Sequence, residues 1–204
     1  MEVENNKEGV PFEHYVGLFL KLDPAEAAAR TGVPFDGEAF TVTLVGVDYR
    51  ITWPEYSITS PVEGAFALNV LPAQTFLLRY LLEGKQVAAT GEFKTFREMP
   101  WGEVYIKPFT GRCLTRAAFT FGTRVSAFAA AMEKLGAEKI KYGDAGYELE
   151  LLPGYRMRLI VWEGDDEFPP NAQILYSDNF AEGFAAEDRV VSGDIMISVV
   201  KSKM

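Results

Sequence analysis

Cysteine and histidine are almost absent from this sequence, whose 204 residues include one of each, Cys113 and His14. A single cysteine cannot form an internal disulfide, and an iron–sulfur cluster usually takes four thiolates. We therefore expect neither a disulfide nor an iron–sulfur cluster within the chain. A single histidine likewise excludes a metal centre built from several imidazoles.

Long apolar stretches are also lacking. The longest runs, such as residues 159–162, fall far short of the roughly 20 residues that a membrane-spanning helix needs. The first thirty residues carry scattered charges, and they lack the basic start and apolar core of a signal peptide. The sequence therefore predicts no membrane partner and no export signal, and a cytoplasmic location is expected.

Basic residues are also few compared with acidic ones. The chain has 20 Lys and Arg against 29 Asp and Glu, which gives a net charge of -9. An acidic protein repels phosphate backbones at long range, and the basic residues here are scattered, so nucleic acid is not expected as a partner. Hydrophobic residues make up 48% of the chain, as in an ordinary globular protein.

The order of the predicted elements indicates an α+β fold, with antiparallel hairpins and a meander packed with several helices. Asp23-Pro24 is typical of an N-cap followed by proline at the first helical position, and Gly32 is typical of a helix end. We expect helices within 12–30 and over 71–82, 110–121, 123–135 and 186–200, and strands over 40–44, 49–53, 91–96 and 103–108. A flexible segment over 1–11 and a single domain over 12–204 are predicted.

The last third of the chain has the clearest pattern. Residues 147–152 and 155–162 alternate and flank Pro153-Gly154, a strong turn dipeptide, and a third strand is expected over 173–176. These strands would form an antiparallel meander over 146–176. Strands that come in hairpins favour α+β over a parallel sheet with crossover helices.

None of the standard catalytic or nucleotide-binding motifs occurs in the sequence. His14 is expected to be a partly exposed helix residue, or else a lone axial ligand to a haem or corrinoid metal. Cys113 is expected to be a small buried hydrophobe, or else a thiolate ligand aided by Arg112 and Arg116. Trp101, at a predicted turn, either stacks on a ligand or packs over a neighbouring strand.

The most unusual stretch runs from Trp162 to Pro170 and places four carboxylates within five residues. Carboxylate oxygens suit calcium or magnesium, although the spacing is not that of an EF-hand. The alternative is a solvated loop with Trp162 and Phe168 turned into the core. The predicted metal ligands are Glu163, Asp165, Asp166 and Glu167.

Several segments together resemble a family of uncharacterised proteins known as DUF3786. They are Lys21-Leu22-Asp23-Pro24, residues 28–32, Tyr80-Leu81-Leu82, Thr90-Gly91-Glu92, Phe96-Arg97-Glu98, Tyr142-Gly143-Asp144-Ala145 and, most specifically, residues 162–169. The resemblance extends from about residue 12 to the end. The resemblance implies a protein of the kind found in anaerobic bacteria and methanogens. Some family members carry an added cysteine-rich segment, which this chain lacks.

Anaerobes of this kind often rely on corrinoid and other tetrapyrrole chemistry, so the resemblance implies a non-catalytic, accessory protein of anaerobic metabolism that binds cobalamin or another tetrapyrrole. The alternatives are a divalent-metal-dependent enzyme that uses the acidic loop 163–167, and a protein-interaction module without a small ligand. His14 is the default axial ligand, with Met99 or Tyr105 as substitutes. The residues expected to line a tetrapyrrole slot are Phe12, His14, Tyr15, Trp101, Tyr105, Trp162 and Phe168.

Overall fold

The computed structural model describes residues 6–204, which form two compact units that meet in sequence between Gln86 and Val87. The chain combines helices with two antiparallel sheets, so the α+β prediction is confirmed. Whether the two units behave as the predicted single domain stays a prediction. Among the described residues, no helix has both the length and the apolar character that crossing a bilayer requires.

The first unit contains a three-stranded sheet in the order β1-β2-β3. Its strands pair antiparallel, and the hairpin of β1 and β2 confirms the alternation in the sequence, with Phe40 opposite Ile51 and Val42 opposite Tyr49. All four of these side chains are buried. The elements are α1 (Asn6–Phe19), α2 (Pro24–Thr31), β1 (Ala39–Leu44), β2 (Val47–Thr52), β3 (Ile58–Thr59), η1 (Phe66–Asn69) and α3 (Leu71–Glu83).

The helix ends of the first unit follow the sequence signals. The Asp23 carboxylate accepts hydrogen bonds from the backbone N–H groups of Ala25 and Glu26, and Gly32 ends α2 in the left-handed conformation, with φ 71°. Of the segment predicted to be flexible, residues 1–5 lie outside the described residues, and α1 begins at Asn6.

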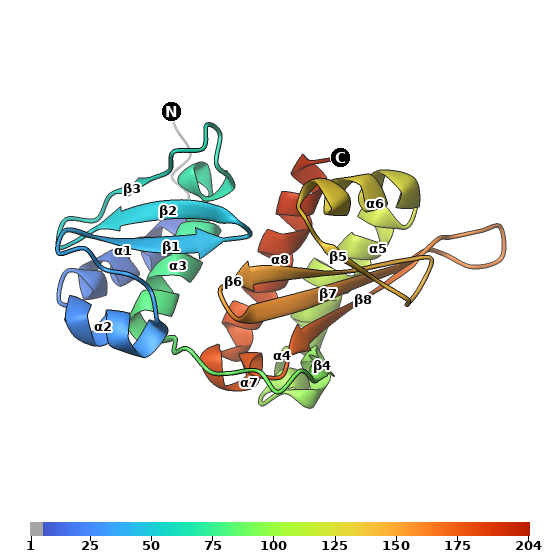
Figure 1. The fold of residues 1–204 in the computed structure, drawn as a ribbon. Helices are drawn as coiled ribbons and strands as arrows, with labels where there is room; N and C mark the ends of the chain where they lie inside the picture. Colours follow the sequence, from blue (N-terminus) through green and yellow to red (C-terminus); the bar gives the residue numbers. More distant parts are fainter. Residues whose placement is uncertain (1–5) are drawn as a thin grey trace. The chain divides into compact units, whose positions relative to one another are not determined.

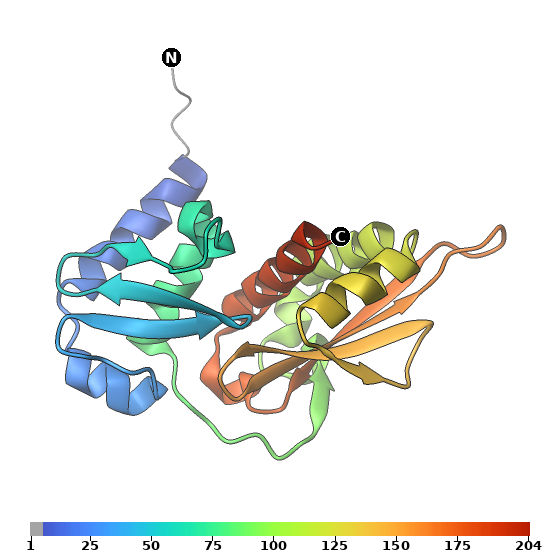
Figure 2. The same cartoon turned by 45° about the horizontal axis from the view of Figure 1, so that its top comes forward.

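The second unit is built on a five-stranded antiparallel sheet in the order β4-β8-β7-β6-β5. Figures 1 and 2 show α5, α6 and α8 along one face of this sheet. The elements are β4 (Phe93–Thr95), η2 (Phe96–Glu98), α4 (Gly102–Phe109), the π-helical segment η3 (Thr110–Thr115), α5 (Arg116–Phe121), α6 (Val125–Lys134), β5 (Glu138–Ile140), β6 (Ala145–Leu152), β7 (Tyr155–Trp162), β8 (Asn171–Ser177), α7 (Phe180–Gly183) and α8 (Ala186–Ser202).

The predicted meander is confirmed, because β6, β7 and β8 pair in sequence order, all antiparallel. Along β7 the side chains of Tyr155, Met157, Leu159 and Val161 are buried, as expected for the strand face that packs against the helices. The intervening residues point to the opposite face. There, the Glu148 carboxylate binds the guanidinium groups of Arg156 and Arg158.

The strand predicted over 103–108 is wrong, because these residues belong to helix α4. Val104 and Ile106 alternate as in a strand, but the exposed and buried positions follow the helical period instead. Trp101, Val104 and Tyr105 are exposed, whereas Phe109 is buried. The strand predicted over 91–96 survives as the short edge strand β4.

Candidate functional site

The acidic loop connects β7 to β8 and projects beyond the ends of these strands (Figure 1). It is held in shape by one of its own carboxylates. Asp165 Oδ1 accepts hydrogen bonds from the backbone N–H groups of Glu167, at 2.8 Å, and Phe168, at 2.7 Å. The bonds from Phe168 and Glu167 lower the pKa of the Asp165 carboxyl group. Asp165 is therefore engaged in holding the loop.

The root of the loop is fixed to two neighbouring segments. The backbone N–H of Glu163 donates to Asp144 Oδ2 at 2.7 Å, and that of Gly164 donates to the Gly122 carbonyl at 3.3 Å. A Cβ atom added to Gly122 or Gly164 would lie 2.6 Å from the ring of Pro170. Glycine is therefore required at both positions for the loop to close against the end of α5.

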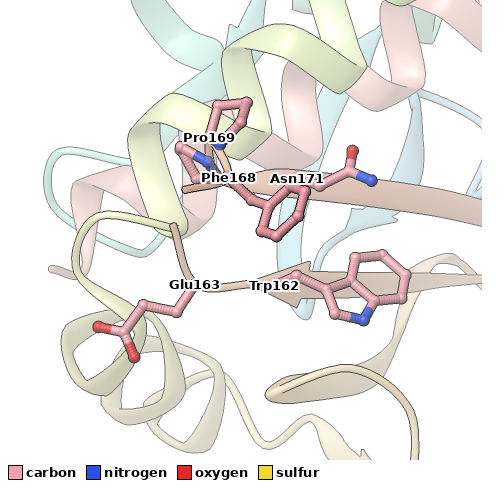
Figure 3. A pocket seen from close by; sticks show the side chains of 6 residues that line it. Trp162, Glu163, Phe168, Pro169 and Asn171 are labelled. Atoms are coloured by element: carbon pink, nitrogen blue, oxygen red, sulfur yellow. The ribbon is translucent and has the colours of Figure 1, made fainter. Parts of the chain in front are cut away.

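An open pocket of about 460 Å³ lies at this root, lined by Trp162, Glu163, Phe168, Pro169, Pro170 and Asn171. Its volume falls in the usual range of small-molecule sites, roughly 300–1,000 Å³. Trp162 and Asn171 form the last residue pair of β7 and β8. Figure 3 shows the rings of Trp162 and Phe168 turned toward the same opening, with Asn171 beside them and Glu163 directed away.

Both aromatic rings are accessible, since Trp162 is 38% and Phe168 is 67% exposed. The alternative in which these two side chains turn into the core is therefore wrong. The buried residue at this end of β7 is Val161, and strand alternation sends Trp162 to the opposite face. Neither ring packs against another aromatic ring among residues 6–204, so both are free to stack on a ligand.

The loop carries several carboxylates that residues 6–204 leave without a cationic partner. Within residues 6–204, the carboxylates of Glu163, Asp166 and Glu167 form no ion pair or side-chain hydrogen bond. The same described range contains no group of three or more His, Cys, Asp or Glu side chains arranged to hold a metal ion. The metal site predicted at Glu163, Asp165, Asp166 and Glu167 stays a prediction.

The other residues predicted to line a tetrapyrrole slot belong to other segments of the chain. In the first unit, His14 is exposed on α1 with its ring 5.3 Å from that of Tyr15, and Tyr15 lies beneath the Arg79 guanidinium, at 5.2 Å. Phe12 packs edge-on against Tyr56 in the same unit. These residues share no element with the aromatic pocket.

Trp101 and Tyr105 belong to the second unit but do not line the pocket. Trp101 is 71% exposed and has a positive φ of 62°, which is unusual for a bulky residue, and Tyr105 lies one turn further along α4. Met99, the substitute axial ligand, is buried. The exposed position of Trp101 agrees with its predicted availability for stacking.

Cys113 is a buried hydrophobe, as the simpler of its two interpretations states. Burial raises the pKa of its thiol to about 12, and the nearby Asp194 adds to the increase. The two arginines that were expected to favour a thiolate instead bind Asp194, with Arg112 Nη2 at 2.6 Å and Arg116 Nη1 at 2.5 Å from its carboxylate oxygens. Cys113 is thus not prepared to act as a thiolate ligand.

Of the residues that line the pocket, Trp162 and Phe168 were predicted to contact a ligand and Glu163 was predicted only as a metal ligand, whereas the other half of the pocket was not predicted. Asn171 and the two prolines, Pro169 and Pro170, complete its wall. The proline pair was a detectable signal, because it ends the loop and directs the chain back into β8. Asn171 had no signal of its own, since its place beside Trp162 depends on the register of β7 and β8.

These features define an α+β protein with an open aromatic pocket at the root of a structured acidic loop. A family model described as a domain of unknown function, DUF3786, matches residues 23–199, and the protein belongs to this family. The match runs from the N-cap of α2 into α8, so it includes the pocket and parts of both units. No curated protein and no solved structure matches the sequence.

Proposed function

We propose that this DUF3786 protein is a non-catalytic binding protein whose ligand stacks in the aromatic pocket. The observation that carries the proposal is the pair of exposed rings, Trp162 and Phe168, at a single opening. Exposed aromatic side chains provide large, rigid contact areas for flat ligands. The sequence motifs that would favour catalysis are absent, which supports binding over chemistry.

We further propose a tetrapyrrole, such as a corrinoid or haem, as the ligand class. The family resemblance suggests this class, and the pocket supports it through its two rings, its proline walls and its open side. A macrocycle is wide and flat, so an open pocket can hold one edge of it while the rest stays exposed. In this proposal, the protein is an accessory component of anaerobic metabolism in the cytoplasm.

The test is a visible-absorbance titration of the purified protein with haem and with cobalamin under anaerobic conditions. Trp162→Ala and Phe168→Ala are each expected to weaken binding by roughly tenfold, because apolar and stacking contacts supply most of the affinity. The matched controls are Trp101→Ala and Phe119→Ala, which remove exposed rings outside the pocket.

The controls are expected to leave the affinity unchanged. If Trp101→Ala weakened binding as much as Trp162→Ala, the ligand would lie in the wider slot that the sequence suggested. If neither haem nor cobalamin bound at micromolar protein, the tetrapyrrole proposal would be wrong, and a protein-interaction module would be the better interpretation.

A further inference from the structure

The sheet face that carries Trp162 also carries two side-chain amides of β8, those of Asn171 and Gln173. Along β8 the side chains of Ala172 and Ile174 are buried on the face that packs against the helices, so Asn171 and Gln173 point to the opposite face. Asn171 is the direct partner of Trp162 in the register of β7 and β8, and directly opposed residues project from the same face. The proposed function gives these amides no role.

Both amides lie close to the ring of Trp162. Asn171 lines the aromatic pocket, and Figure 3 shows it beside the rings of Trp162 and Phe168. Gln173 pairs with Ile160, so it lies diagonally across from Trp162, at a spacing of roughly 7–8 Å that long side chains can bridge. A ligand stacked on Trp162 therefore has both amides along one edge.

The amide of Asn171 is held in one orientation. Its Oδ1 accepts a hydrogen bond from the backbone N–H of Ala172 at 2.8 Å, which determines on which side the nitrogen lies. Within residues 6–204, Nδ2 of Asn171 has no hydrogen-bond partner, and the residue is exposed. Asn171 thus offers a ligand a donor, and its oxygen is already engaged.

The amide of Gln173 is available at both of its atoms. The residue is half-buried, yet its side chain forms no hydrogen bond with any other described residue. Both atoms reach the surface, because the buried and unbonded side-chain nitrogen and oxygen atoms of residues 6–204 belong to other residues. A carboxamide can satisfy both the donor and the acceptor of Gln173, whereas a carboxylate or an ester can only accept.

The surroundings of the ring do not favour an anionic ligand edge. Among the described residues, those that line the aromatic pocket include no basic side chain. The next charged residue along this face of β7 is Arg158, four positions from Trp162, and its Nε is bound to Glu148 Oε2 at 2.8 Å. The protein has a net charge of -9. A carboxylate placed beside Trp162 would lose hydration without gaining a cation.

We propose that Asn171 and Gln173 form hydrogen bonds with carboxamide groups at the edge of the stacked ligand, so that the site selects a neutral, amide-bearing macrocycle. Asn171 donates to an amide oxygen, and Gln173 both donates and accepts. This inference rests on the proposed function and narrows its ligand class, because corrinoids carry carboxamides around the macrocycle, whereas haem carries carboxylates.

The test titrates the protein with three zinc porphyrins that share one macrocycle and differ only in their side groups: a diamide, a dimethyl ester and a dicarboxylate. The amide and the ester are both uncharged, so their difference measures hydrogen bonding rather than charge. The wild-type protein is expected to bind the diamide about fivefold more tightly than the ester, as one hydrogen bond contributes. The dicarboxylate should bind least tightly.

The variants separate the two amides. Gln173→Met has a similar length and no amide, so it should lose the preference for the diamide and keep the affinity for the ester. Asn171→Ala should weaken both by about fivefold, because Nδ2 can donate to the carbonyl oxygen of either. The control, Leu175→Met, places the same side chain at the next position on this face of β8 and should keep the preference.

The outcomes distinguish the inference from the proposed function. If the wild type bound the diamide and the ester equally, or if Gln173→Met kept the preference, the inference would be overturned while stacking on Trp162 stood. Unchanged affinities in Asn171→Ala would overturn it too, as would loss of the preference in Leu175→Met, since the effect would then not depend on the amides. If none of the three porphyrins bound, the proposed function would fall with it.

Discussion

Asp165 and Asp166 are neighbours in sequence, yet they have different structural roles. Asp165 accepts two backbone hydrogen bonds across the loop, whereas Asp166 has no partner within the described residues. Composition cannot separate two such carboxylates. Only the path of the chain between β7 and Pro169 decides which of them faces the N–H groups. The metal prediction, which treated the four acidic residues alike, did not take this difference into account.

Replacing Asp165 by alanine is therefore expected to lower the melting temperature measurably, because two backbone N–H groups lose their acceptor. Asp166→Ala should leave it level or raise it slightly, since one like charge is removed. Asp165→Asn, which keeps an acceptor oxygen, should lie between them. Calorimetry of the three variants without metal checks this. Equal melting temperatures for Asp165→Ala and Asp166→Ala would show that the Asx-type bonds do not hold the loop.

His14 offers a second prediction at the residue scale. The aromatic pocket is lined by no imidazole, thiol or thioether, so an axial ligand of this kind to a macrocycle bound there would come from another segment of the chain. If His14 is that ligand, His14→Ala shifts the Soret or corrin band while the affinity falls only in part, because apolar contact supplies most of it. Absorbance spectra of the loaded variant decide the point. An unchanged spectrum would remove His14 from the site.

Among the helices and strands, the predictions from sequence were most accurate where the local residue pattern and the packing in the folded protein favour the same element. Strands β6 and β7 alternate, and Pro153-Gly154 turns the chain between them, so both the strands and their pairing could be predicted. The prediction failed for helix α4, because Val104 and Ile106 alternate with polar residues as in a strand over a short stretch. The helix is fixed instead by a tertiary contact, in which Phe109 stacks on Phe96 with the ring centroids 4.2 Å apart.

The candidate site shows the same limit. Trp162 and Phe168 stand in one unusual stretch, so composition alone was enough to select them. Asn171 could not be connected with Trp162 in the same way, because its place beside that ring depends on the pairing of β7 with β8. A contact that arises from the register of two strands leaves no trace in the local sequence.

The packing of η3 against α8 gives a prediction at the element scale. Gly193 of α8 lies against η3, and a Cβ atom there would be 2.8 Å from Cys113 Sγ and 3.2 Å from the Tyr176 hydroxyl oxygen. Gly193→Ala is therefore expected to destabilise the protein by about 1–3 kcal/mol. Gly111→Ala, in η3 itself, meets open space and should be neutral or stabilising by up to about 1 kcal/mol.

Chemical denaturation of the two glycine variants measures both free energies of unfolding. The pair is matched, because each variant adds one methyl group to a helical segment of the second unit. Equal stabilities would contradict the close approach of α8 to η3, since only that approach distinguishes the two positions.

At the scale of the whole molecule, the titrating groups define the pH range of stability. Arg50 holds the pKa of Asp36 at about 2, and Thr95 lowers that of Glu98. A carboxyl group whose pKa is lower in the folded state stabilises the protein above its unfolded value of about 4, and this contribution is lost as the pH falls toward the folded value. Burial raises the pKa of Tyr155 to about 12 and that of Tyr176 well above its usual value.

For these tyrosines the stabilisation is present below pH 10 and declines as the pH rises above it, because the unfolded chain ionises first. The melting temperature is therefore expected to be level between about pH 5 and 9 and to fall on both sides. In the Asp36→Asn variant, the melting temperature should fall less steeply as the pH is lowered below about 4. A melting temperature that did not change between pH 4 and 2 would contradict the role given to these carboxylates.

Stacking of a flat ligand on Trp162 is the central feature of the proposed function. The most direct measurement is 19F NMR of protein labelled with 5-fluorotryptophan, titrated with a diamagnetic tetrapyrrole such as cobalamin or a zinc porphyrin. The chain has three tryptophans, Trp53, Trp101 and Trp162, so three resonances are expected, each assigned by a Trp→Phe variant. The Trp162 resonance is expected to shift most, because ring-current effects act only at short range, while that of the half-buried Trp53 stays in place. A bound tetrapyrrole that leaves the Trp162 resonance unmoved, or moves that of Trp101 instead, would show that the ligand does not stack on Trp162.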